Sequence, residues 1–379
     1  MKYLFLFFCV SFFAQTKIFE IRDEENNQPI FAARINIDGL IYYTNDDGKV
    51  ILPVDKKALI TAKNFDDVNI YLSQQNNGII KLAPKYNEIE EIILRPIKVK
   101  PIFENLLKYY NKYYGVEPTI YGIQMKQKAK ESNNLNNLFV SDLNLWVYDG
   151  EYHFNSKLYS FAQMSINKVE YYQTRKNDID YRFNNDLNIK PEQFIQKLFF
   201  NSQIAGIVND FKDIKINANI VFEDKNKKKI KFHTALNEKY GYDCEGEFIL
   251  SNEDNMIVYF ELYINQAKTI SQKVNRKKEK YLTKTNFVSL IYDFYKKDGK
   301  YIPTRYEAKG SGVNIYKGEE TPFDFSQEII YKSTTKGDKK GLENKIDLSK
   351  PLTDNIPINE IKDTKTLLST EEQKFVDEP

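Results

Sequence analysis

Apolar and polar residues alternate along most of the chain, and this period of two predicts a mostly β protein. In the first part, short alternating stretches such as 33–37 and 58–62 are separated by turn residues such as 45–48. Six or seven short strands at this spacing predict a small N-terminal β-sandwich over residues 15–96.

Longer alternating stretches follow in residues 119–332. The clearest pair is 244–250 and 256–264, which are separated by the turn residues 252–255. A second pair joins 287–295 to 301–308, and 323–331 is the last expected strand. Sequential hairpins of this length predict a larger curved antiparallel β-sheet, one concave face of which must be covered.

Two stretches have helical rather than strand spacing. Within the linker 97–118, Pro101 suits a first helical turn and Gly115 a helix end. The apolar positions between them recur on one side: Phe103, Leu106, Leu107, Tyr110 and Tyr114. Residues 191–200 predict a second short helix, and either helix could cover the concave face.

The two ends of the chain differ from the rest. Residues 1–14 read as a signal peptide, with Lys2, an apolar run that includes Cys9, and Ala14 before the expected cleavage point. The run is shorter than the about 20 residues of a transmembrane helix, and no second run of that length follows. We therefore expect export to the periplasm or outer-membrane periphery of a Gram-negative bacterium, with no transmembrane helix in the mature chain. Charged residues and prolines predict a mobile C-terminal tail over 333–379.

Residues 17–95 also carry a family resemblance. The segments that carry it are Arg22-Asp23, Gln28-Pro29-Ile30, Ala32-Ala33 and Thr44-Asn45-Asp46-Asp47-Gly48-Lys49-Val50. They resemble the carboxypeptidase-like regulatory domain, a transthyretin-like β-sandwich frequent in exported proteins of Bacteroidetes-type bacteria. Asn45 and Val50 depart from the family, which has an aspartate and an aromatic residue there. The resemblance implies an accessory module and brings no catalytic residues.

Composition narrows the range of partners. Lys+Arg total 55 and Asp+Glu 53, so the net charge of +2 gives no reason to expect nucleic acid. The 27 Tyr and 26 Phe are more readily explained by biased codon usage than by a sugar-binding surface. Two basic runs, 225–231 and 273–280, fit hairpin loops that either contact anionic lipid headgroups or lipopolysaccharide phosphates, or are simply solvated.

Candidate catalytic and metal-binding residues are sparse. His153 and His233 are isolated, so no metal site or cofactor is predicted. Cys244, the one cysteine of the mature chain, alternates with apolar residues and is expected to be a small buried residue. Asp46-Asp47-Gly48 predicts a turn rather than a calcium loop, because Lys57 stands at the twelfth position. Glu247 and Glu261 could form an acid–base pair if they are cross-strand neighbours, or lie on a solvated face balanced by lysines.

These observations favour binding over catalysis, and we predict that the protein is not an enzyme. The concave face would hold an apolar or amphipathic ligand such as a lipid or lipoprotein acyl chain, in a layout similar to the half-barrel of lipoprotein carriers. Val258, Phe260, Leu262 and Ile264 would line that cavity or form an ordinary core. Two alternatives remain. One is a structural or protein-interaction module that docks an outer-membrane partner and has a filled sheet interior. The other is a carbohydrate-binding or carbohydrate-active protein that uses Trp146 and Tyr148.

Overall fold

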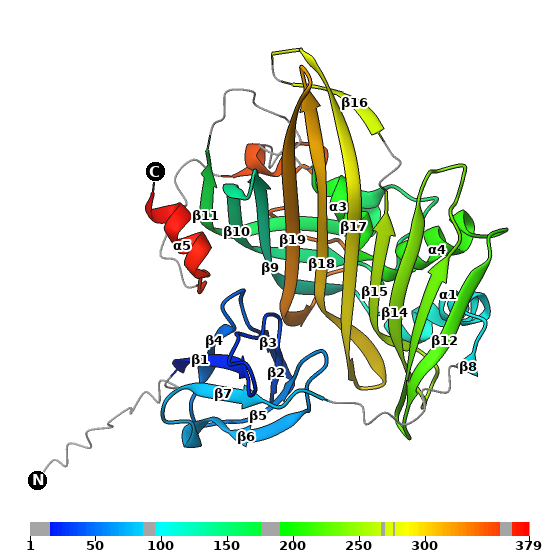
Figure 1. Ribbon diagram of the computed structural model, residues 1–379. Coiled ribbons are helices and arrows are strands. Elements are labelled where there is room, and N and C mark those ends of the chain that lie inside the picture. The colour runs from blue at the N-terminus through cyan, green and yellow to red at the C-terminus, as the bar shows by residue number, and fades with distance from the viewer. Residues whose placement is uncertain are drawn as a thin grey trace, which may run out of the picture. The chain divides into compact units, whose positions relative to one another are not determined.

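The computed structural model describes residues 16–85, 95–175, 190–266, 270–275, 277–356 and 366–378, which fall into two compact units (Figure 1). Unit 1 comprises Met1–Glu88 together with Leu367–Asp377, and unit 2 comprises Ile89–Thr366 with Glu378–Pro379. The expected signal peptide, with Cys9, and the expected strand at 92–94 lie outside the described residues.

Unit 1 is built from two small sheets. One has the order β4 (Lys49–Pro53), β1 (Thr16–Asp23), β7 (Ile79–Leu82). The other has the order β3 (Leu40–Tyr43), β2 (Arg34–Ile37), β5 (Lys57–Thr61), β6 (Val68–Tyr71), followed by a 3-10 turn at Leu72–Gln74. Apolar residues at alternate positions, including Phe19, Ile21, Ile35 and Ile60, are fully buried in one core. The first unit is therefore β-sandwich-like, as its alternation predicts.

The turn at residues 44–48 is held by side chains of the motif that carries the resemblance. The Thr44 hydroxyl donates to the Ile30 carbonyl (2.6 Å) and accepts from the Ala33 amide (2.9 Å). Asn45 Oδ1 accepts the Lys49 amide at 2.9 Å. Gly48 has φ +71°, and a Cβ there would lie 2.6 Å from the Ile21 carbonyl oxygen, so this turn requires glycine.

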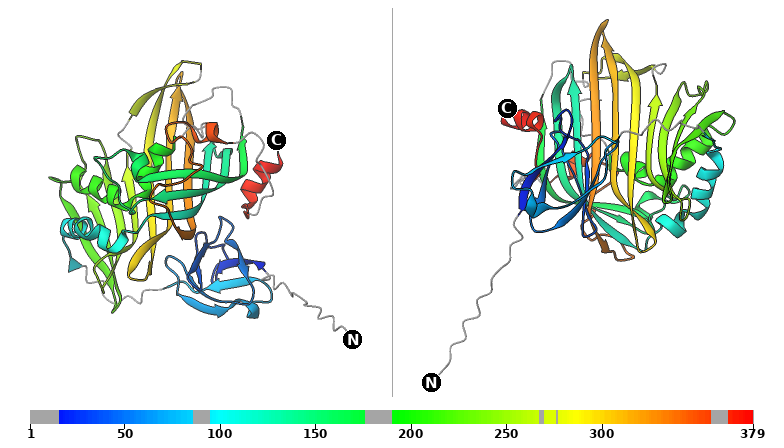
Figure 2. Two further views of the ribbon diagram at one scale, coloured as in Figure 1. Left: turned by 180° about the vertical axis from the view of Figure 1, so that it is seen from behind. Right: turned by 60° about the horizontal axis from the view of Figure 1, so that its bottom comes forward.

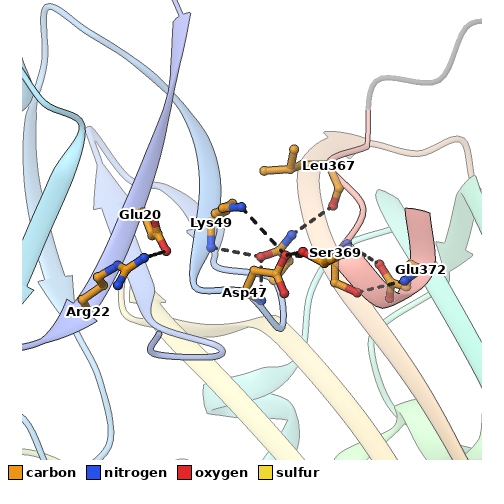
Figure 3. A network of polar contacts seen from close by, with 9 residues as sticks. Glu20, Arg22, Asp47, Lys49, Leu367, Ser369 and Glu372 are labelled. Carbon is orange, nitrogen blue, oxygen red and sulfur yellow. Dashed lines mark hydrogen bonds and ion pairs between the residues drawn. The ribbon is translucent and has the colours of Figure 1, made fainter. Parts of the chain in front are cut away.

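Residues 367–377 complete unit 1 and form α5 (Thr370–Asp377) (Figure 3). Asp47 Oδ2 accepts from both the amide (2.8 Å) and the hydroxyl (2.7 Å) of Thr370. The Ser369 amide donates to Glu372 Oε2 (2.8 Å) and the Glu372 amide to Ser369 Oγ (3.3 Å), which is a capping box. This helix lies in the segment predicted to be a mobile tail, and the Ser-x-x-Glu spacing at 369–372 is the local signal for its start.

The described part of unit 2 forms one 12-stranded sheet in which every pairing is antiparallel. Its order is β11 (Ala162–Thr174), β10 (Asn134–Val147), β9 (Thr119–Glu131), β19 (Glu319–Lys336), β18 (Lys300–Tyr316), β17 (Lys280–Lys297), β15 (Ile257–Asn265), β14 (Asp243–Ser251), β13 (Lys227–Thr234), β12 (Ile216–Glu223), β8 (Arg95–Pro96), with β16 (Ile270–Val274) paired to β17. Most neighbours are consecutive hairpins, which confirms the predicted antiparallel sheet. The exceptions are β15 with β17, β12 with β8, and β9 with β19, the last of which joins the two ends of the predicted region. Residues 95–96, predicted to end the sandwich, instead pair with β12.

Three helices pack on one face of this sheet: α1 (Lys100–Tyr114), α3 (Pro191–Leu198) and α4 (Phe200–Asp210). The sheet curves around them, as Figure 2 shows from behind (left). The predicted helix at 102–114 corresponds to α1. The predicted helix at 191–200 is two helices, because Phe199 has an extended backbone (φ −88°, ψ 110°) and ends α3 before α4 begins.

Residues 337–356, predicted as part of the mobile tail, pack along β10 and β11. The Gly337 amide donates to the Pro118 carbonyl (2.7 Å), and the Ile346 amide donates to the carbonyl of Met164 in β11 (2.8 Å). Leu348 and Leu352, which begins a 3-10 turn (Leu352–Asn355), are buried in the core beside the helices. The segment thus contacts β11, the edge strand of the sheet, at Gln163 and Met164. Two isolated leucines give no periodic signal, so the sequence pattern does not reveal this packing.

Candidate functional site

The strand residues predicted to line a ligand cavity lie on the helix-covered face of β15. Phe260 and Leu262 are 0% and 1% exposed, and Val258 and Ile264 pack partly buried beside them. Phe260 lies against aromatic rings from helices and neighbouring strands, at centroid distances of 5.4–6.4 Å: Phe103, Phe200, Phe232, Phe248 and Tyr292. Of the two roles that the sequence leaves open for these four residues, this packing matches the ordinary core.

A cavity of about 30 Å³ lies further along the same face, between the helices and the sheet. Its lining is largely aromatic: Tyr110, Tyr114, Tyr121, Leu145, Val147, Gly150, Leu198, Phe199, Phe294, Tyr301, Pro303 and Tyr331. One water needs roughly 10–15 Å³, and drug-sized ligands occupy about 300–1,000 Å³. This cavity therefore fits a water or two and is about tenfold smaller than the site of a drug-sized ligand.

The tyrosines around this cavity are uncharged hydroxyl groups. Burial is the main cause that raises the pKa of Tyr110, Tyr121 and Tyr331 well above the ordinary value near 10. Tyr114 donates its hydroxyl to the Ile257 carbonyl at 2.6 Å. At neutral pH these groups can donate and accept hydrogen bonds, but none of them supplies a phenolate base.

Trp146 and Tyr148 lie on the opposite face of β10 from the core and make an edge-to-face contact at 6.3 Å. Trp146 is 1% exposed, and its Nε1 donates to the Asp338 carbonyl at 2.8 Å. A Cβ on Gly337 would lie 2.8 Å from the indole, so residues 337–338 rest on the ring. Tyr148 is 42% exposed. The structure brings the two predicted residues together, but only Tyr148 presents a ring that a ligand could stack upon.

The nucleophile and base candidates are far from a catalytic arrangement. Burial raises the pKa of the Cys244 thiol to about 12, so the reactive thiolate is not formed near neutral pH. His153 Nε2 lies 2.9 Å from Asp149 Oδ2, and His233 Nε2 lies 3.0 Å from Asn217 Nδ2. Within the described ranges, no group of three or more His, Cys, Asp or Glu side chains could hold a metal ion.

Glu247 and Glu261 are direct cross-strand partners on β14 and β15. Each has another partner. Lys229 Nζ lies 3.3 Å from Glu247 Oε2, and the Tyr259 hydroxyl donates to Glu261 Oε2 at 2.8 Å. The alternation leaves open an acid–base pair or a solvated face balanced by lysines. The contact with Lys229 matches the balance by lysines, but Glu247 is only 8% exposed and so is not solvated.

Asp254, in the turn between β14 and β15, ties this hairpin to the next one. Its carboxylate accepts hydrogen bonds from Lys296 Nζ at 2.8 Å and from the Tyr301 hydroxyl at 2.9 Å. Burial by itself raises the pKa of Asp254, but the hydrogen bonds from Lys296, a backbone amide and Tyr301 outweigh it and hold the pKa below its usual value. The local pattern at 252–255 predicts only a turn, and nothing in it signals the distant lysine and tyrosine.

We expect Asp254→Asn to lower the free energy of unfolding of unit 2 by about 2 kcal/mol at neutral pH, since hydrogen bonds to a charged group contribute ~1.5–3 kcal/mol. Because the folded pKa is the lower one, this contribution is present above the unfolded pKa of about 3.9 and is lost as the pH falls through the folded pKa. Urea unfolding followed by the fluorescence of Trp146, the one tryptophan of the chain, measures it.

The matched control is Asp298→Asn in the exposed turn of the next hairpin, where asparagine tolerates the positive φ of 50°. A loss of stability that is the same for both variants, or that does not shrink toward acid pH, would contradict the assignment.

No helix among the described residues is long and apolar enough to cross a membrane. When the chain is compared with protein-family models, curated proteins and solved structures, nothing matches it.

Proposed function

We propose that this chain is a non-catalytic interaction protein of the bacterial cell envelope, which engages a partner through its surface and not through a ligand held inside the sheet. The observation that carries the proposal is the filled concave face. Helices α1 and α4 insert Phe103 and Phe200 against β13–β17, on the face where an internal ligand would lie.

An internal acyl chain would have to displace these contacts. Phe103 and Phe200 are 0% and 1% exposed, and burying one such side chain contributes roughly 1.5–3 kcal/mol. Opening the face for a lipid would expose both rings together with their partners on the sheet. That cost favours the solid interior of an interaction module over the carrier that the strand pattern alone suggests.

The chemistry of the described side chains also supports a non-catalytic role. The Cys244 thiol is buried and protonated, and Glu247 is engaged by a lysine. The placement in the envelope rests on the leader-like residues 1–14, and the accessory role of unit 1 rests on its resemblance to the carboxypeptidase-like regulatory domain. The β-sandwich-like pair of sheets in unit 1 supports that resemblance.

Native mass spectrometry of the protein purified from a bacterial periplasm tests the proposal. We expect the mass of the chain alone, both before and after organic extraction, because the cavity between the helices and the sheet has room only for water. A lipid that co-purifies at one molecule per chain and disappears on extraction would contradict the solid interior. It would instead favour the hypothesis that the protein is a lipid carrier.

A further inference from the structure

Strand β16 and the first residues of β17 form a hairpin at one end of the sheet of unit 2, where β17 also pairs with β18 (Figure 1). Strand β16 pairs only with residues 280–284 of β17, whereas β17 pairs with β15 from Phe287 onward. No other strand in the described part of the chain pairs with β16. One edge of this hairpin is therefore open.

One face of the hairpin is apolar and exposed. The pairs Gln272–Leu282 and Leu282–Ile315 place Ile270, Val274, Leu282 and Ile315 on the same side. Ile270 is 59% exposed, Val274 42% and Leu282 40%. We call these four residues the hairpin face. Tyr281 and Thr283, on the opposite side of β17, are each only 2% exposed.

Lysines surround the hairpin face. Lys280 and Lys284 lie on it, opposite Val274 and Ile270, and the exposed Lys277 and Lys278 form the turn. Asn275 fixes this turn, because its carbonyl accepts the Lys278 amide (3.0 Å) and its side chain accepts the Glu279 amide (2.9 Å).

Acidic residues near the tip offset only part of this charge: Glu279 interacts with Lys277, and Glu320, opposite Ile315, lies on the same side as the hairpin face. Glu279 faces the Tyr316 hydroxyl at 2.6 Å and Lys317 at 3.8 Å. The second basic run, 225–231, differs, because Lys228 and Lys229 there pair with Glu223 and Glu247. Of the two runs that the sequence analysis singles out, the run at β16–β17 is the one that combines positive charge with exposed aliphatic side chains.

We propose that the hairpin face docks on a membrane leaflet that carries anionic headgroups. The aliphatic side chains would enter the boundary between headgroups and acyl chains, while the lysines remain with the headgroup phosphates. A second copy is disfavoured as the occupant, because stacking two hairpin faces would bring Lys280 and Lys284 of both copies together. Nucleic acid is disfavoured because the hairpin face offers no aromatic ring for base stacking. The inference rests on the proposed function and identifies the partner of that interaction protein as an anionic membrane leaflet.

Co-sedimentation of the full exported chain with vesicles tests the inference. We expect binding to phosphatidylcholine vesicles that contain phosphatidylglycerol, little binding to pure phosphatidylcholine, and a decrease with salt. Lys278→Glu/Lys280→Glu should weaken binding by at least on the order of 30-fold, from about tenfold per 1.4 kcal/mol and ~1 kcal/mol per lysine. Ile270→Ser/Leu282→Ser should also weaken it, while both double variants keep the unfolding transition of the parent.

The matched control is Lys225→Glu/Lys227→Glu, the same charge change in the other basic hairpin, which should bind as the parent does. Equal loss in this control, no preference for the anionic vesicles, or retention by heparin that the Ile270→Ser/Leu282→Ser change leaves intact would each overturn the inference. The outcome is separable from that of the proposed function. A lipid inside the purified protein contradicts the solid interior, whereas absent vesicle binding with a clean mass contradicts only the membrane partner.

Discussion

Replacing Phe260 by alanine is expected to lower the free energy of unfolding of unit 2 by about 3–5 kcal/mol, the usual cost of emptying a buried phenylalanine site. Phe260 is fully buried, and its ring meets Phe103 of α1 and Phe200 of α4. These partners belong to different elements and cannot all move into the space left behind. Urea unfolding followed by Trp146 fluorescence reports on unit 2 alone, since the chain has one tryptophan.

The matched control is Tyr263→Ala on the same strand. Tyr263 is 41% exposed and stacks on Phe287 at 4.9 Å, so its loss should cost no more than about 1 kcal/mol. If Phe260→Ala cost as little as Tyr263→Ala, the helix-covered face would be loosely packed, and the interior would again be a candidate ligand site.

The second large effect is expected at Gly312 in β18, where alanine should cost about 3 kcal/mol. A Cβ at Gly312 would lie 2.4 Å from the Lys284 carbonyl oxygen of β17 and 2.5 Å from the Phe323 ring of β19. The ring could turn, but the carbonyl belongs to the sheet backbone, so the two strands would have to separate. The same unfolding measurement detects the loss.

Gly206 provides the control for this substitution. It lies in α4, and a Cβ there would meet no atom within 4 Å. Gly206→Ala should therefore raise stability by roughly 0.5–1 kcal/mol through helix propensity. A neutral Gly312→Ala would show that β17 and β18 are further apart than the structure places them.

Local patterns predict much of this fold. The hairpin of β14 and β15 follows from alternation on both sides of 252–255, and α1 follows from its apolar stripe and Pro101. These features depend on residues close in sequence, whose periodicity records which side is buried. The tendency of a long meander to curl also predicts that helices would cover one face.

Non-local packing is not readable in the same way. The pairing of β9 with β19 joins segments about 200 residues apart, and the pattern of neither strand indicates which strand it pairs with. Leu348 and Leu352 enter the core from a polar stretch without periodicity. They are buried among residues of the helices and the sheet that lie far away in sequence.

The candidate site shows the same division. The alternation of Val258, Phe260, Leu262 and Ile264 predicts that they share an apolar face, and they do. Whether that face is a cavity or a core depends on Phe103 and Phe200, which come from other elements. Similarly, Trp146 is a candidate for stacking on a ligand from the sequence alone, but in the structure residues 337–338 contact its ring and it is buried.

The position of α5 has a consequence for biogenesis. Unit 1 takes its strands from residues 16–82 and its helix from 370–377, so unit 2 is an insertion within it. On a ribosome, or in a translocation channel that the N-terminus enters first, the sandwich strands emerge early. The helix that completes unit 1 emerges only after almost the whole of unit 2. A premature stop near residue 366 would therefore remove α5 from unit 1. Asp47 would lose its contacts with Thr370, although about 300 residues of chain separate Asp47 from the stop.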